Sequence, residues 1–301
     1  MGEAVQHDVD FAIVDVDTWE LADTESSGGD EKQWLTDPDG ARWLFKPRTE
    51  QDGWSQGEDW AEKIATHLAG LFGVPAARVE LARRGDRYGS ISCSLLPKGW
   101  ELQHGALLLG AAIPGFETHN RARTGHTLDN IERVLEPVAS PATHTLFTAF
   151  DVFAGYLLLD ALVANQDRHE ENWAVLRPLT QAGGDTLAGS YDHGSSLGFN
   201  LQDQRRSLLL ERGGVDSFAR KGRAQRFEQS TDGKLTLVEL ADRALGRSSA
   251  AARAHWHAGL DRLSEEVLQD TVDRVPELSA PSRRFTLELL KTNRRRLHHE
   301  Y

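Results

Sequence analysis

The sequence predicts an α+β fold with two lobes, a small β-rich lobe at the N-terminus and a larger, mostly helical lobe after it. Short apolar runs separated by turn residues fill the first hundred residues, and one amphipathic helical pattern interrupts them. A mid-chain segment is apolar nearly all round, as expected of a helix buried within a lobe. Amphipathic helical patterns then return over 236–299. We place the two lobes at 1–98 and 99–301.

In the N-terminal lobe, residues 10–47 predict strands. Two of the apolar runs flank residues 37–40 (DPDG), a strong hairpin turn. Apolar positions at helical spacing predict a helix from 58 to 72, which a Gly-Val-Pro sequence ends. Strand-like sequence resumes at 77–82 and 89–96. This lobe should therefore be one sheet with one helix.

In the C-terminal lobe, helix should dominate from about Lys98 onward. The apolar segment at 145–164 predicts the buried helix. Residues 165–200 indicate loops and short strands, including a hairpin closed by a Gly-Gly-Asp turn. The later helical patterns include 254–275 and 281–298.

Composition excludes several classes of protein. The 301 residues carry a formal net charge of −12, which argues against direct binding of nucleic acid, because such proteins normally have a basic face. The single cysteine, Cys93, excludes an intramolecular disulfide framework and a zinc site made of several thiolates. No segment has the pattern of a membrane span or a secretory signal. We therefore expect a cytoplasmic protein that does not associate with membranes.

A dense group of polar residues, 165–173 (NQDRHEENW), directly follows the apolar segment. Holding so many polar groups together is costly unless a function uses them. Asp167 and Asn172 are five residues apart, the spacing of the catalytic-loop Asp and Asn of kinases, which accept the substrate proton and bind Mg²⁺. Downstream, Asp192 is followed two residues later by Gly194, which matches the metal-binding Asp of kinases. Asn172 and Asp192 are therefore the candidate metal ligands.

The N-terminal lobe supplies candidates for binding ATP. Lys46 ends an apolar strand, and Glu62 lies on the following helix away from its apolar stripe. A strand Lys paired with a helix Glu is how kinases hold the phosphates of ATP. By order along the chain, we place the adenine contacts near Leu96. A turn positioned to cover the phosphates with backbone N–H groups is made of Ser26, Ser27, Gly28 and Gly29.

Simpler structural roles are open for each of these residues. The cluster around Asp167 would also serve as a capping and ion-pair group at a helix end. Lys46 would also suit a surface position with its charged end in water. His169, Asp192 and His193 would alternatively be ligands of a catalytic metal hydrolase, although that leaves Lys46 without a role.

The sequence resembles the HipA-like kinases, the family of the HipA toxin of bacterial toxin–antitoxin modules. The resemblance covers most of the chain and is carried by residues 43–47 (WLFKP), 58–65 (EDWAEKIA), 165–173 and 191–197 (YDHGSSL). It implies a bilobal protein-kinase-like fold and transfer of the γ-phosphoryl group of ATP, with Mg²⁺, to a serine or threonine of a protein substrate. It also implies an antitoxin or another regulatory partner.

The resemblance assigns a role to each matching residue. Lys46 would contact the ATP phosphates, and Glu62 would anchor Lys46. Asp167 would be the catalytic Asp, while Asn172 and Asp192 would hold Mg²⁺. Lys46, Asp167 and Asn172 are thus the candidate catalytic residues.

Several alternatives and departures accompany the resemblance. Ser26 and Ser27 are candidates for autophosphorylation. We expect the chain to lack the extra N-terminal subdomain of the toxin, and it carries His193 where kinases have Phe. The 165–173 segment is also similar to phosphoinositide 3/4-kinases, so a small-molecule or lipid-headgroup kinase is an alternative. A regulatory pseudokinase and a relative that transfers AMP are further alternatives.

Overall fold

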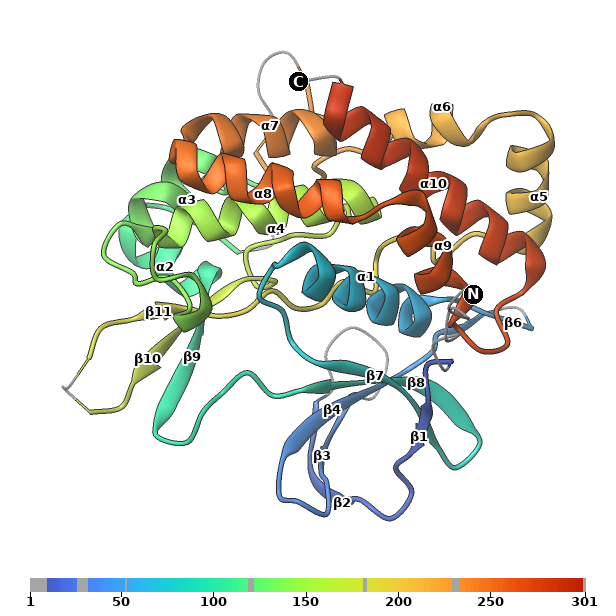
Figure 1. The fold of residues 1–301 in the computed structure, drawn as a ribbon. Coiled ribbons are helices and arrows are strands. Elements are labelled where there is room, and N and C mark those ends of the chain that lie inside the picture. The colour runs from blue at the N-terminus through green and yellow to red at the C-terminus, as the bar shows by residue number, and fades with distance from the viewer. Residues whose placement is uncertain are drawn as a thin grey trace, which may run out of the picture.

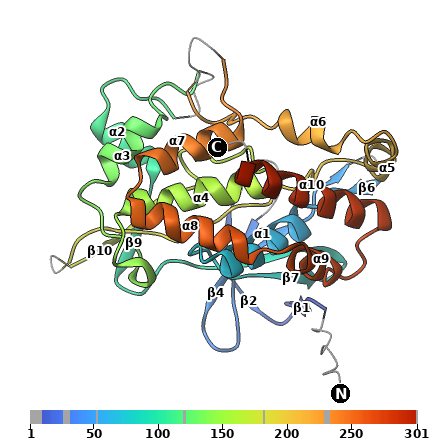
Figure 2. The ribbon, with the colours of Figure 1, turned by 45° about the horizontal axis from the view of Figure 1, so that its top comes forward.

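The computed structural model describes residues 10–25, 32–51, 53–118, 122–180, 183–228 and 233–299. These residues form a small lobe built on a β-sheet and a larger helical lobe, with helix α1 (Glu58–Phe72) between them (Figure 1). After rotation the sheet again lies to one side of the stacked helices (Figure 2). The predicted α+β fold, with a β-rich N-terminal part and a helical C-terminal part, is confirmed. The boundary at 98/99 stays a prediction.

The main sheet has six strands in the order β1-β7-β8-β4-β3-β2. Its strands are β1 (Ile13–Asp15), β2 (Glu20–Glu25), β3 (Lys32–Thr36), β4 (Arg42–Pro47), β7 (Val79–Arg84) and β8 (Arg87–Cys93). Neighbouring strands are antiparallel except β1 and β7, which are parallel. A small hairpin follows β4, formed by β5 (Glu50–Gln51) and β6 (Trp54–Ser55). Every strand of the main sheet overlaps a region predicted to be strand.

Helix α1 has the predicted bounds. It packs against β7 and β8 on one side and against helices of the larger lobe on the other, and most of its residues are buried. The backbone N–H of Gly57 donates to the Phe199 carbonyl (3.0 Å) at its start. At its end, the Arg262 guanidinium donates to the Phe72 carbonyl (2.9 Å). Both ends of α1 are therefore attached to the larger lobe.

Helix α4 (Ala149–Val163) is the buried helix predicted over 145–164, and all of its residues are buried. Thr148 and Asp151 form a capping box at its start. The helices that cover it include α7 (Leu237–Arg247), α8 (Ala250–Arg262) and α10 (Ala280–His299). Because every face is covered, the helix carries no polar stripe.

Two expectations for the larger lobe are wrong in detail. Residues 100–104, expected to begin the helical part, form strand β9 (Trp100–His104), which pairs with β10 (Ala174–Pro178). The cross-strand partner lies some seventy residues away, so local sequence did not reveal it. The helix predicted over 254–275 is divided into α8 and α9 (Glu265–Asp273), because Ser264 caps α9 by accepting the Val267 N–H (3.3 Å).

The remaining expectations agree with the structure. The predicted hairpin is β10 with β11 (Thr186–Leu187), and α10 matches the pattern at 281–298. The other helices are α2 (Gly105–Ala112), α3 (Leu128–Leu135), η1 (Ala142–His144), α5 (Asp203–Glu211) and α6 (Val215–Arg220). None of the helices among the described residues combines the length and hydrophobicity needed to span a lipid bilayer.

Candidate active site

A pocket of about 590 Å³ lies between the main sheet and the larger lobe. One wall comes from the small lobe and includes Leu44, Lys46 and Leu96. The opposite wall comes from the loops after α4 and β11 and includes Asn172 and Asp192. Its size is within the range of pockets that bind small molecules and cofactors. Lys46, Leu96, Asn172 and Asp192, which are candidates from both lobes, thus face one cavity, which we call the interlobe pocket.

Strand alternation places Lys46 in the interlobe pocket. Successive side chains of a strand point to opposite faces. Trp43 and Phe45 are buried in a core on one face of β4, whereas Leu44 and Lys46 line the pocket on the other. The Lys46 side chain is 17% exposed. The alternative of a lysine extended over the surface is therefore wrong.

Lys46 joins Glu62 and Asp192. Its Nζ lies 2.7 Å from Oδ1 of Asp192 and 3.5 Å from Oε2 of Glu62. Glu62 is buried on α1, and Asp192 lies 146 residues away in sequence from Lys46. The structure therefore brings the predicted pair of a strand Lys and a helix Glu together with Asp192, a loop residue that the sequence proposed separately.

The charges of this group depend on one another. Burial alone would raise the pKa of Asp192, but Lys46 outweighs burial and holds that pKa well below its usual range. Burial alone would lower the pKa of Lys46, but the Asp192 and Glu62 carboxylates raise it. Burial raises the pKa of Glu62, although Lys46 opposes this shift. Lys46 and Asp192 are therefore both ionised at neutral pH.

The loop after α4 is shaped by its own polar side chains. Ala164 has a left-handed φ of 55° and ends the helix. The Asp167 N–H then donates to Oδ1 of Asn165 (3.0 Å), and Nδ2 of Asn172 donates to the Asp167 carbonyl (2.8 Å). These bonds use the amide nitrogen of Asn172 and leave its amide oxygen as an acceptor. We call residues 164–173 the catalytic-loop segment.

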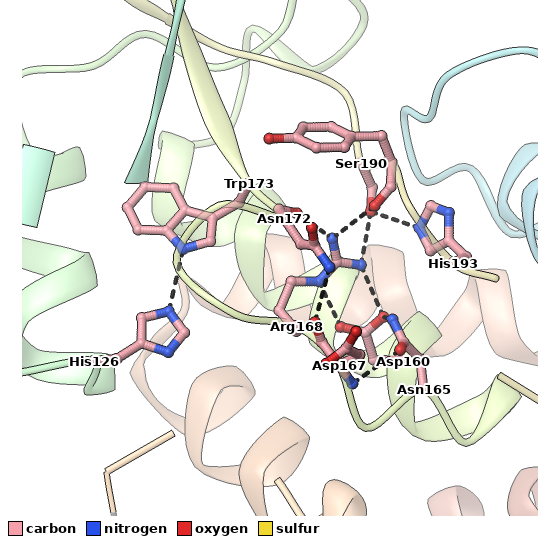
Figure 3. A network of polar contacts seen from close by, with 10 residues as sticks. His126, Asp160, Asn165, Asp167, Arg168, Asn172, Trp173, Ser190 and His193 are labelled. Atoms are coloured by element: carbon pink, nitrogen blue, oxygen red, sulfur yellow. Dashed lines mark hydrogen bonds and ion pairs between the residues drawn. The ribbon is translucent and has the colours of Figure 1, made fainter. Parts of the chain in front are cut away.

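Arg168 is the centre of a buried network beneath this loop (Figure 3). Its guanidinium pairs with Asp160 through Nε (2.7 Å) and a terminal nitrogen (2.8 Å). It also donates to the Asn172 carbonyl (2.6 Å) and to Oγ of Ser190 (2.9 Å). Ser190 Oγ lies 2.7 Å from Nε2 of His193, whose pKa burial lowers well below its usual value. The network joins the loop to the Asp192 segment, and the sequence analysis did not find it.

The carboxylate of Asp167 lies at a second pocket, of about 310 Å³. Arg226 Nε donates to its Oδ1, and Ser195 Oγ donates to its Oδ2 at 3.4 Å. Arg226 and Ser195 also line this pocket. The sequence analysis assigned no role to either residue. We call this second cavity the acceptor-side pocket.

The other proposed residues are placed as follows. Ser26, Ser27, Gly28 and Gly29 lie outside the described residues. Leu96 lines the interlobe pocket and is 40% exposed. His104 also lines this pocket and has Nδ1 close to the Glu171 carbonyl (2.9 Å) and the Tyr191 hydroxyl (3.0 Å).

The residues predicted to hold Mg²⁺ fit that ion chemically. Asn172 and Asp192 offer an amide oxygen and a carboxylate to the same pocket, and Mg²⁺ typically takes one or two such ligands together with phosphates and waters. Across the described ranges, no three His, Cys, Asp or Glu side chains are grouped so that they could hold a metal ion. His193, moreover, is fully buried against Ser190. The alternative metal hydrolase therefore has no ligand set in this part of the chain.

Comparison with solved structures identifies the fold. The Helicobacter pylori proinflammatory kinase CtkA superposes with a TM-score of 0.73 over 96% of this chain and 98% of that one, at 15% identity. The chain has a protein-kinase-like fold. The Shewanella oneidensis MR-1 toxin–antitoxin structure of HipA, HipB and operator DNA matches with a TM-score of 0.52 over 93% of this chain and 66% of that one, at 12% identity.

The protein-kinase-like fold confirms what the resemblance to HipA-like kinases implied about architecture. At these low identities the likeness concerns the fold alone. Neither a protein-family model nor a curated protein sequence matches the chain. The chemistry of the site must therefore be argued from its own residues.

Proposed function

We propose that the chain is an ATP- and Mg²⁺-dependent kinase that transfers the γ-phosphoryl group to a serine or threonine hydroxyl of a protein. One observation carries the proposal: Lys46 contacts both Glu62 and Asp192 at a pocket that Asn172 also lines. Kinases hold ATP with this combination of a strand Lys, a helix Glu, a metal-binding Asp and a catalytic-loop Asn. The protein-kinase-like fold supports the same reading.

The interlobe pocket is the proposed nucleotide site. Lys46 supplies a positive charge for the phosphates, and Glu62 holds its ammonium from α1. Leu44 and Leu96 offer apolar contacts to the adenine. Asn172 and Asp192 are proposed to hold Mg²⁺, which when bound would supply positive charge to the phosphates. Phosphate covering by Ser26, Ser27, Gly28 and Gly29 stays a prediction.

Asp167 is the proposed catalytic residue for the acceptor hydroxyl. Its carboxylate would accept the hydroxyl proton while the hydroxyl oxygen bonds to the γ-phosphorus and the bond to the β-phosphate oxygen breaks, releasing ADP. Most of the acceleration would come from positioning and charge, because phosphoryl transfer asks little covalent chemistry of the protein. The pairing of Asn172 Nδ2 with the Asp167 carbonyl supports this, since it couples a metal ligand to the base.

The expected partners follow from the same proposal. The main partner is a protein with a serine or threonine acceptor. An antitoxin or other regulatory partner is the second candidate, because a HipA toxin–antitoxin structure shares the fold. The cytoplasmic location and the lobes at 1–98 and 99–301 stay predictions.

Mass spectrometry of the purified protein after incubation with Mg-ATP tests the proposal. Wild type and Asp167→Ala are compared, with Asp270→Ala, an exposed residue of α9, as the matched control. Phosphate on wild type and the control, and none on Asp167→Ala, is the expected result. Equal modification of all three would contradict the role of Asp167. Added AMP in place of phosphate would contradict phosphoryl transfer.

A second assay separates the remaining alternatives. Radiolabelled ATP is supplied with a cell extract, and the label in protein, lipid and small-molecule fractions is measured. Label in lipids or metabolites alone would replace the protein substrate with a small molecule. Calorimetric binding of ATP without any transfer would indicate a regulatory pseudokinase.

A further inference from the structure

A basic segment of the chain borders the acceptor-side pocket. Residues 219–226 (ARKGRAQR) contain four Lys or Arg and no Asp or Glu, in a chain whose net charge is −12. This segment, which we call the basic segment, begins in the last turn of α6 and contributes several residues to the pocket, including Gly222, Gln225 and Arg226. Of its four basic side chains only Arg226 lines the pocket, but the segment as a whole carries a charge opposite to that of the chain.

The basic segment is attached to the catalytic-loop segment. The backbone N–H of Arg223 donates to Oε1 of Gln166 (3.0 Å), and Nε of Arg226 donates to Oδ1 of Asp167. On the other side, Nδ1 of His126 bonds the Arg226 carbonyl (2.7 Å). The segment is therefore positioned beside the Asp167 carboxylate by bonds to both of its neighbours.

Part of the positive charge of this segment is not compensated by an ion pair within the described ranges, since Arg220 and Arg226 are paired with carboxylates but Lys221 and Arg223 are not. Lys221 is exposed, and Arg223 donates to the carbonyls of Arg220 (2.6 Å) and Gly222 (3.3 Å), which are neutral. Neither Lys221 nor Arg223 forms an ion pair with a carboxylate of the described residues. Of the acidic side chains nearby, Asp216 pairs with Arg220, while Glu239 completes the capping box of α7 and is close enough to attract Arg223.

We propose that the acceptor-side pocket binds the acceptor segment of the substrate, and that this segment is acidic, with Asp or Glu beside the hydroxyl. The inference rests on the proposed kinase function and names its substrate class. Arg226 lies where the hydroxyl must approach Asp167, so an acidic neighbour of that hydroxyl would give Arg226 a second carboxylate. Lys221 and Arg223 would attract further acidic residues, and a basic peptide would be repelled.

Peptide binding without ATP tests this inference independently of catalysis. Two fluorescent peptides carry one serine each, flanked by Glu in one and by Lys in the other, and anisotropy reports their affinity. The natural chain should bind the Glu peptide more tightly, and added salt should weaken that binding. The double variant Lys221→Glu and Arg223→Glu should bind it roughly tenfold more weakly, because an exposed and a half-buried attractive charge both become repulsive.

A second double variant is the matched control. Arg87→Glu and Arg133→Glu make the same change of net charge at exposed positions of β8 and α3. This control should bind the Glu peptide as the natural chain does. An equal loss in both double variants would mean that only net charge matters, and it would overturn the inference.

Other outcomes would also overturn it. Tighter binding of the Lys peptide would contradict an acidic acceptor, even if that peptide were phosphorylated and the kinase function thereby supported. A single-stranded RNA that bound more tightly than the Glu peptide, and lost binding in the Lys221 and Arg223 variant, would assign the surface to nucleic acid instead. If the chain bound the Glu peptide but showed no transfer activity, the kinase function would be refuted, whereas the site for an acidic peptide would be supported.

Discussion

Asp160 and Arg168 form a doubly bonded ion pair that is almost completely buried under the catalytic-loop segment. Asp160 comes from the apolar helix α4, and Arg168 follows it by eight residues. A buried ion pair of this kind adds little to the free energy of unfolding compared with apolar residues of the same shape. Removing one partner, however, is strongly destabilising, because it leaves the other charge buried without a partner. The pair therefore makes the shape of the loop dependent on both residues.

Loss of one member of this pair should be severe. Asp160→Asn is expected to reduce the free energy of unfolding by about 3–5 kcal/mol, because the Arg168 charge loses its partner in the interior. Urea denaturation measures the change. Asp216→Asn, which breaks the exposed pair with Arg220, is the control and should cost under about 1 kcal/mol. Similar losses in both variants would show that the buried pair has no special role.

The pairing of Lys46 with Glu62 should affect phosphoryl transfer more than folding. Glu62→Gln removes the buried carboxylate that holds Lys46, and kcat/KM for ATP should fall by roughly 100-fold, the usual effect of losing one electrostatic contact of this kind. Initial rates at varied ATP concentrations measure this. The control is Lys291→Met, which breaks the pair with Glu265 on the larger lobe and should leave the rate unchanged.

Stability should fall as the solution becomes acidic, partly through His126. Its Nε2 accepts from Nε1 of Trp173 (3.2 Å), so the ring must be neutral, and burial lowers its pKa to about 4. In the unfolded chain the pKa is about 6.5, so the unfolded state binds more protons between these values. The contribution of His126 to the free energy of unfolding is complete above about pH 6.5 and is lost as the pH falls toward 4. The loss amounts to about 2 kcal/mol by pH 5.

Urea denaturation at pH 7 and pH 5 measures this contribution. His126→Gln should show a smaller loss of stability between the two pH values than the natural chain. His193 is also buried with a lowered pKa, so a part of the pH dependence should persist in that variant. The exposed His257→Gln variant should keep the whole of it. An unchanged pH dependence in His126→Gln would contradict the prediction.

The close approach of β8 to β4 should make Gly89 sensitive to substitution. A Cβ at Gly89 would lie 2.1 Å from the Lys46 carbonyl oxygen, so Gly89→Ala must displace the strand that carries Lys46. We expect a loss of stability of about 2 kcal/mol and weaker ATP binding, measured by calorimetry. Gly70→Ala, at an open position of α1, should instead stabilise the chain by up to about 1 kcal/mol.

Local patterns revealed much of the fold. Helix α1 was predictable to the residue because apolar positions at helical spacing end at a Gly-Val-Pro sequence. Strand β9 was not, since its pairing with β10 is a long-range event that leaves no local mark. The break between α8 and α9 was missed, although Ser264, a favourable N-cap within the pattern, could have indicated it.

The site was predictable in part for the same reasons. Lys46 was found as a charged residue at the end of an apolar strand, and Asp167 and Asp192 were found by spacings typical of kinase motifs. Their roles stay predictions. Arg226 lies 59 residues from Asp167, so nothing in its neighbourhood indicated the contact. Asp160 offered a signal that was missed. A carboxylate well inside an apolar helix must find a buried partner, and Arg168 is the next arginine along the chain.

The attachment of α1 to the larger lobe limits how this protein could be regulated. Gly57 and Phe72 bind that lobe at the two ends of the helix, and the Phe72 ring packs against Trp256 with centroids 6.0 Å apart. Swinging α1 outward to withdraw Glu62 from Lys46 would expose this aromatic contact and break both hydrogen bonds. An off-state reached by moving that helix is therefore disfavoured. A regulatory partner that blocks the mouth of either pocket would not need to break these contacts.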